Sequence, residues 1–115
     1  MLTLQDRCIR AMDQMVRNQT LIKIGEDYVA SENEKPQDIE ESFIHHFSIE
    51  LNDSIAVPYG KARVDGRDTK GIIDEYLERY AERIEHEMAK MGVANSTRTV
   101  IKAKLLAQLD EKYIY

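Results

Sequence analysis

The feature that most constrains the fold is the stretch 71–91, GIIDEYLERYAERIEHEMAKM, in which apolar side chains recur at a spacing near 3.6 residues. That spacing places them on one face of an α-helix. The recurring positions are Ile73, Tyr76, Leu77, Tyr80, Ile84, Met88 and Met91. At about 1.5 Å per residue the helix would be roughly 30 Å long, nearly twice the average. We therefore expect it to be the spine of a helical bundle or of a homodimer.

Length and composition favour one folded domain over 1–115. A chain of 115 residues can bury a core without disulfides or a structural metal. Its formal charge of −5, with 32% charged and 43% apolar residues, is typical of a folded rather than a disordered protein. Cys8 is the single cysteine, and neither a signal-peptide pattern nor an apolar run of about 18 residues occurs. We expect a cytoplasmic protein that does not contact a membrane.

Two helices are predicted before residue 53. Thr3 is suited to be an N-cap with Asp6 three residues later, and the apolar face that follows predicts a helix to about Asn18. Pro36 suits the first position of a second helix, which we expect to end near Asn52. The apolar stripe of this second helix consists of Ile39, Phe43, Ile44, Phe47 and Leu51.

Capping signals delimit the last two helices. Asp68 or Thr69 can cap the 71–91 helix, and Gly92 suits the position just past its end. Polar side chains at 95–97 can then cap a fourth helix. The apolar face of this fourth helix consists of Val100, Ile101, Leu105, Leu106, Leu109 and Tyr113.

Two segments do not show a clear periodicity. The stretch 20–30 alternates briefly at 22–24 before Gly25, so strand, helix and loop all stay open, and the same holds for 54–67. Because 53–70 contains Pro58, Gly60 and an Asp65-Gly66 pair, we expect a structured loop there that caps one end of the bundle. The predicted fold is an all-α bundle of about four helices, with room for a short β element.

The charge is distributed unevenly along the chain. Nine acids stand against two lysines between Lys23 and Asp53, a net charge of −7, whereas 61–70 and 92–115 each carry +2. Clustered carboxylates on a rigid element can steer and dock a basic partner. We therefore expect a non-enzymatic protein-interaction module, an inhibitor or adaptor. The predicted partner-binding residues are Glu34, Asp38, Glu40, Glu41 and Glu50.

The alternative function is that of a small dimeric regulator that binds nucleic acid. Basic side chains of the 61–70 loop and of the start of the fourth helix could contact phosphates. The candidate residues are Lys61, Arg63, Arg67, Arg98 and Lys102. The acidity of the remaining chain argues against this alternative, because it would repel DNA at a distance.

No catalytic or metal-binding signature is complete. His45 and His46 are adjacent, so on a helix they point about 100° apart and cannot share one metal ion without a second chain. A second cluster, Glu82, Glu85, His86 and Glu87, lacks a neighbouring nucleophile and reads as a solvated helix face. Cys8 lies on the apolar face of the first helix, where a thiol is unreactive. We predict no catalytic residue, no metal and no cofactor.

Overall fold

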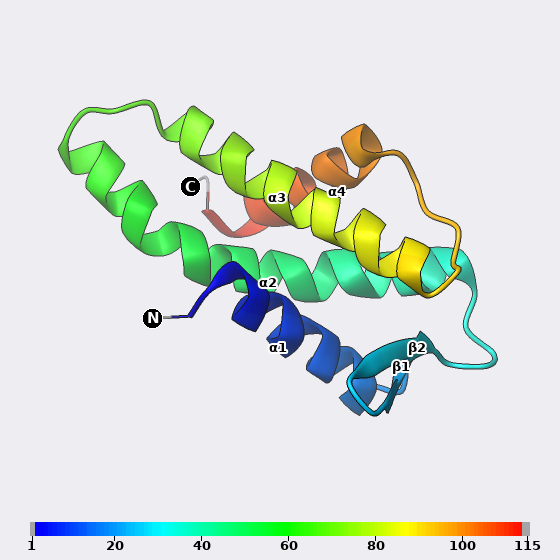
Figure 1. Cartoon of the computed structure of the whole chain (residues 1–115). Coiled ribbons are helices and arrows are strands. Elements are labelled where there is room, and N and C mark those ends of the chain that lie inside the picture. Colours follow the sequence, from blue (N-terminus) through cyan, green and yellow to red (C-terminus); the bar gives the residue numbers. More distant parts are fainter. Residues whose placement is uncertain (1, 114–115) are drawn as a thin grey trace.

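The computed structural model describes residues 2–113, with side chains described for 2–109. In this part of the chain, four helices accompany one two-stranded antiparallel sheet (Figure 1). The elements are α1 (Leu4–Arg17), β1 (Leu21–Ile24), β2 (Asp27–Ala30), α2 (Pro36–Val64), α3 (Thr69–Lys90) and α4 (Arg98–Tyr113). The predicted all-α class with a short β element is confirmed, and the open segment 20–30 is a β-hairpin.

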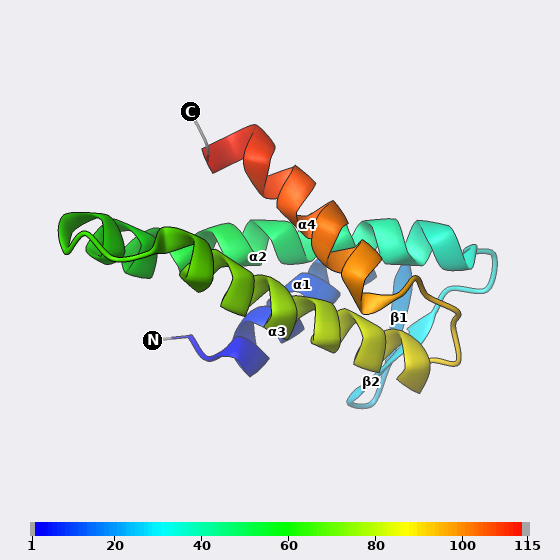
Figure 2. The same cartoon turned by 90° about the horizontal axis from the view of Figure 1, so that it is seen from above.

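Helix α2, rather than α3, is the central element of the bundle. It has 29 residues against 22 in α3, and α1, α3 and α4 all pack against it (Figures 1 and 2). The predicted loop over 53–70 is therefore wrong, since the helix continues through Pro58 to Val64. Ile55 and Ala62 lie on the face of α2 that is buried, so packing outweighs the helix-breaking tendency of the proline.

Helix α2 bends near Pro58, and Figure 1 shows this bend as the change in direction of the green half of the helix. A proline has no N–H, so the carbonyl of Ser54 cannot receive its usual helical hydrogen bond, and the proline ring crowds the preceding turn. The bent helix ends at Val64 with Asp65 as its C-cap, and Gly66 follows with a φ of +70°. Asp65-Gly66 thus ends a helix, whereas the sequence pattern placed this pair within a loop.

The predicted caps of the helices are confirmed. In α1, the Thr3 hydroxyl accepts a hydrogen bond from the Asp6 backbone N–H, and the Asp6 carboxylate accepts one from the Thr3 N–H. Asp68 accepts from the Lys70 N–H at the start of α3. Gly92, with a φ of +71°, lies just past the end of that helix. The Thr97 hydroxyl accepts from the Val100 N–H at 3.4 Å, so the 95–97 segment caps α4.

The core lies along the buried face of α2. Phe43 and Phe47 stack with their ring centres 5.4 Å apart, and the Tyr80 ring of α3 meets Phe47 edge-on at 5.7 Å. Aromatic pairs in these geometries add to the stabilisation from their buried area. The largest fully buried side chains are Tyr80, Phe43, Phe47, Met12, Met15, Leu21, Ile39, Leu51, Ile55, Ile84, Met88 and Ile101.

The apolar face of α3 is used within one chain. Tyr80, Ile84 and Met88 are fully buried, while Tyr76 and Met91 are half-buried and pack against the same core. Helix 71–91 was expected from its sequence to be the spine either of a bundle or of a homodimer. Because α2 and α4 pack against α3 and Arg83 donates to Gln5 of α1, most of this apolar face is used within the chain, and the described residues give no observation that favours the dimer.

Candidate protein-interaction surface

The hairpin β1–β2 is set by a tight turn at Gly25 and Glu26. Ile24 pairs with Asp27 and Ile22 with Val29, so two residues connect the strands. Gly25 has a φ of +64°, whereas Glu26 is not among the residues with positive φ. A positive φ at the first central position alone is the pattern of a type II′ turn, which favours glycine there.

One face of the hairpin packs onto α1. Leu21 is buried, and Tyr28 and Ala30 are half-buried against the core. The Tyr28 hydroxyl donates a hydrogen bond to the Asp13 carboxylate at 2.6 Å. Burial, followed by this hydrogen bond, raises the pKa of Tyr28. The hairpin is thus held to the body of the protein and presents its other face outward.

The outward face carries three large apolar side chains and, opposite Ile24, the exposed Asp27. Ile22, Ile24 and Val29 are 48%, 62% and 40% exposed. Side chains two residues apart on a strand share a face, and Ile22 lies directly opposite Val29, so the three form one patch. Large apolar side chains gathered on a solvated sheet face are typical of an interaction site. Sequence reasoning did not choose these residues, although the alternation at 22–24 was the signal that could have found them.

Exposed acids accompany this patch at the same end of the molecule, along the turn, the connection after β2 and the first turns of α2 (Figure 1). They are Glu26, Asp27, Glu32, Glu34, Asp38 and Glu41. Lys23 and Lys35 are the cations in this range, and Lys23 is 4.0 Å from Asp13. Asp27 forms an exposed ion pair with Lys90 at 3.8 Å. The hairpin patch, defined as Ile22, Ile24 and Val29, therefore lies at the end of the molecule that carries these six acids, which we call its acidic border.

Glu40, one of the five predicted partner-binding acids, bonds within the protein instead. It is 4% exposed and accepts hydrogen bonds from the Ser96 N–H at 2.6 Å, the Ser96 hydroxyl at 2.8 Å and the Lys104 ammonium at 3.0 Å. Burial raises the pKa of Glu40, but these hydrogen bonds outweigh it and leave the pKa below its ordinary value. Glu40 joins α2 to the start of α4.

Glu50 is also turned inward. It is 6% exposed, and its nearest cation is Arg10, whose Nε lies 3.6 Å from a Glu50 carboxylate oxygen. This separation is too long for a hydrogen bond. Burial raises the pKa of Glu50, with Arg10 acting in the opposite direction. Of the five predicted acids, Glu34, Asp38 and Glu41 are exposed and can contact a partner.

The basic residues of the nucleic-acid alternative form two separate groups, in which Arg67, Arg98 and Lys102 pair with acids of the same chain. Arg98 donates to Glu85 at 2.7 Å and to Glu78 at 3.1 Å, and Lys102 lies 2.8 Å from Glu78. These hydrogen bonds raise the pKa of Arg98 and of Lys102. Lys61 and Arg63 belong to the far end of α2 and Arg67 to the turn that follows it, away from the start of α4 (Figure 1).

The turn beyond α2 offers no phosphate-binding surface either. Arg67 pairs with Asp65 at 3.2 Å, and Arg63 lies over the Tyr59 ring, 5.9 Å from its centre. Two separated groups, of which Arg67, Arg98 and Lys102 have carboxylate partners, do not form the continuous basic surface that nucleic acid requires. The structure therefore gives no observation that favours the alternative.

In the histidine and glutamate clusters, His46 and Glu87 make contacts within the protein. His46 is half-buried with its Nε2 3.1 Å from the Asn18 amide nitrogen, while His45 is exposed. Burial lowers the pKa of His46. Glu87 is buried and receives a hydrogen bond from Arg83 at 2.9 Å. Among the side chains of residues 2–109, no three histidine, cysteine or acidic groups gather closely enough to hold a metal ion.

Comparison of the chain with models of known protein families, with curated proteins and with solved structures found no match. Within residues 2–113, no helix combines the length and the apolar composition needed to cross a bilayer.

Proposed function

We propose that this chain is a non-enzymatic protein-interaction module that binds a basic partner through the hairpin patch and its acidic border. The observation that carries the proposal is the exposure of Ile22, Ile24 and Val29 on one face of a sheet whose other face is anchored to the core. The apolar patch would supply buried area on binding, and the surrounding carboxylates would supply steering and orientation.

The chemistry of the surface indicates which kind of partner segment would fit it. A two-stranded sheet within the described chain has an unpaired outer edge on each strand, so an extended segment can add to it by backbone hydrogen bonds. Side chains of an added strand alternate between faces. The best-fitting partner segment therefore alternates apolar residues, which lie beside the hairpin patch, with lysine or arginine residues near the acids.

A peptide titration tests the proposal directly. A capped peptide of alternating valine and lysine is added to the ¹⁵N-labelled protein, and a valine–glutamate peptide of the same length is the control. We expect amide shifts at 21–34 with the basic peptide alone, and weaker binding as salt is raised, since exposed charges are screened. Equal shifts with both peptides, or shifts confined to another surface, would contradict the proposal.

Two pairs of variants separate the apolar and the acidic contributions. The double variant Ile22→Ser/Ile24→Ser should abolish binding, whereas Val57→Ser, at a site 70% exposed on α2, should not affect it. Glu32→Gln/Glu34→Gln should weaken binding and reduce its salt dependence, whereas Asp74→Asn/Glu82→Gln on α3 should leave both unchanged. The same variants applied to proteins retained from a lysate would show which captured molecules use this surface.

A further inference from the structure

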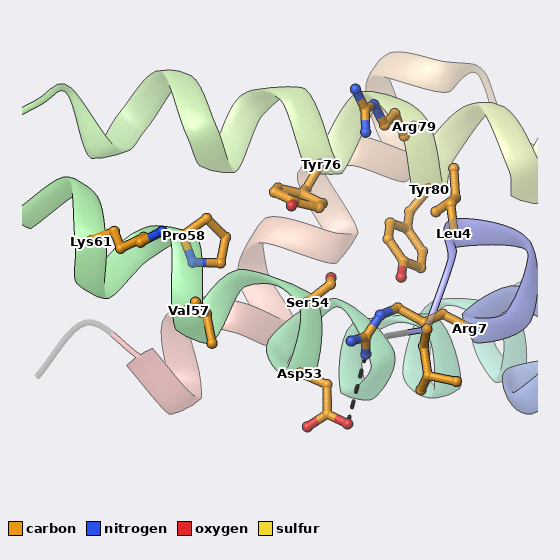
Figure 3. Close-up of a pocket in the computed structure, with 11 residues that line it drawn as sticks. Leu4, Arg7, Asp53, Ser54, Val57, Pro58, Lys61, Tyr76, Arg79 and Tyr80 are labelled. Carbon is orange, nitrogen blue, oxygen red and sulfur yellow. Dashed lines mark ion pairs between the residues drawn. The ribbon is translucent and has the colours of Figure 1, made fainter.

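A cavity of about 430 Å³ lies at the other end of α1 from the hairpin. Its walls come from three elements: the start of α1, the bent half of α2 and the middle of α3 (Figure 3). The bend at Pro58 shapes one wall, and Tyr76 and Tyr80 project from α3 toward the other. The volume is within the range of about 300 to 1,000 Å³ that is usual for small-molecule sites.

Buried donors face this cavity. Tyr80 is fully buried, and its hydroxyl makes no hydrogen bond of ordinary geometry, although it lies beside Ser54. The proton of the Ser54 hydroxyl is donated to the Leu51 carbonyl oxygen at 3.0 Å. The Arg7 Nη1 is likewise buried without a hydrogen bond, its nearest acid being Asp53 at 3.8 Å. Buried polar groups are nearly always hydrogen-bonded, so the Tyr80 hydroxyl and the Arg7 Nη1 are the two donors at this cavity that a ligand can use.

The charge of the cavity walls indicates which charge a ligand would carry. The charged lining residues are Arg7, Lys61, Arg79 and Asp53, and once the Glu75 partner of Arg79 is counted one positive charge is in excess, in a chain whose net charge is −5. Arg79 is compensated by an ion pair with Glu75 outside the cavity. Arg7 and Lys61 remain as the cations for a ligand, and in Figure 3 the Lys61 ammonium and the Arg7 guanidinium lie on opposite sides of Val57 and Ser54.

The remaining wall is apolar. Leu4 and Val57 are exposed at the rim, and Pro58 and the Tyr76 ring continue the same surface inward. We infer that this cavity binds a small amphipathic oxyanion. Its carboxylate or phosphate head accepts hydrogen bonds from the Tyr80 hydroxyl and the Arg7 guanidinium, while its aliphatic or aromatic body lies against Leu4, Val57 and Tyr76. The site is independent of the hairpin patch, since the two are at opposite ends of α1 (Figure 1).

Four eight-carbon probes test the inference: sodium octanoate, octyl phosphate, octan-1-ol and octylamine. Their affinities are measured by amide-shift titration and by calorimetry. We expect octanoate and octyl phosphate to bind with shifts at residues 4–7, 54–61 and 76–80, and the alcohol and the amine to bind at least about tenfold more weakly, because hydrogen bonds to a charged group are the stronger ones. Tighter binding of either anion identifies the head group within the same class.

Variants assign the two donors. Tyr80→Phe keeps the ring that packs on Phe47 and removes the hydroxyl alone, and Arg7→Gln removes the guanidinium. Each should weaken octanoate binding about tenfold or more, whereas Arg17→Gln, at the opposite end of α1, should not. Circular dichroism checks that each variant is folded. Equal binding of octan-1-ol and octanoate, or full affinity in Tyr80→Phe, would overturn the inference.

Discussion

The clearest quantitative consequence of the fold concerns the buried Glu40 carboxylate. Replacing Glu40 with alanine removes the acceptor of three hydrogen bonds, two from Ser96 and one from Lys104. Hydrogen bonds to a charged group contribute about 1.5 to 3 kcal/mol each. The Lys104 side chain is 44% exposed, so its share is about 1 kcal/mol or less. Because the Ser96 hydroxyl is only partly buried and can turn to water, we expect a total loss of about 3 kcal/mol.

Urea unfolding followed by circular dichroism measures this loss. With a slope of about 1.5 kcal/mol per molar urea, the unfolding midpoint of Glu40→Ala should fall by about 2 M. Glu41→Ala is the matched control, because it makes the same change in helix propensity and charge at an exposed site one residue away. That variant should stay within about 0.5 kcal/mol of the parent protein. A cost below about 1 kcal/mol for Glu40→Ala, equal to that of the control, would refute the reasoning.

The acid dependence of the same group provides a second test. The pKa of Glu40 is lower in the folded protein than its ordinary value of 4.5. Its stabilisation is therefore fully present above about pH 4.5 and is lost as the pH falls through the lower folded-state pKa. The stability difference between the parent protein and Glu40→Gln should shrink as the pH is lowered through that window. A difference that stays constant from neutral to acidic pH would contradict the role assigned to the carboxylate.

Two further predictions concern the buried Glu50 and Cys8. Glu50→Gln should raise the thermal midpoint at pH 7 by about 3 °C. The folded protein raises the pKa of Glu50 and so disfavours its charged form. Arg10 is 49% exposed, so it stays solvated when the Glu50 charge is removed. In a pH series, the parent protein should gain stability relative to this variant as the pH falls from neutral through the raised pKa, and a gain on going upward would contradict the assignment. Cys8 is fully buried, and burial raises its pKa to about 11, so a thiol reagent at pH 8 should label it at least about 10³-fold more slowly in buffer than in unfolding urea. Glu40→Ala lowers the free energy of unfolding by about 3 kcal/mol, so it should speed labelling of Cys8 under native conditions about 100-fold. If the native parent protein were labelled as fast as the unfolded protein, the Cys8 thiol would be at the surface, contrary to the structure.

Helix starts and apolar stripes were readable from the sequence because both are local. Thr3 with Asp6 is a capping box within one turn, and Gly92 ends α3 through its own backbone preference. The extent of α2 was not readable for the opposite reason. Whether the chain stays helical at Pro58 depends on the burial of Ile55 and Ala62 against other elements, which is a tertiary effect.

The candidate surface was only half predictable. Clustered acids in 23–53 indicated where negative charge would collect, but acidity alone does not tell which carboxylates face solvent. Glu40 and Glu41 are neighbours in the sequence, yet only Glu40 reaches Ser96, more than fifty residues along the chain. The exposure of Ile22 and Ile24 depends similarly on which face of the hairpin meets α1. Long-range pairing decides both cases.

The bend in α2 divides the molecule into a packed body and a two-helix extension. Between Ile55 and Leu77, a range that is wholly described, Ala62 is the one fully buried residue. Because α-helices repeat their faces about every seven residues, adding seven residues on each side of the turn at 65–68 would lengthen the extension by about 10 Å and leave the body unchanged. This end of the protein can therefore tolerate an insertion, which makes it the place for a reporter domain that leaves the hairpin accessible.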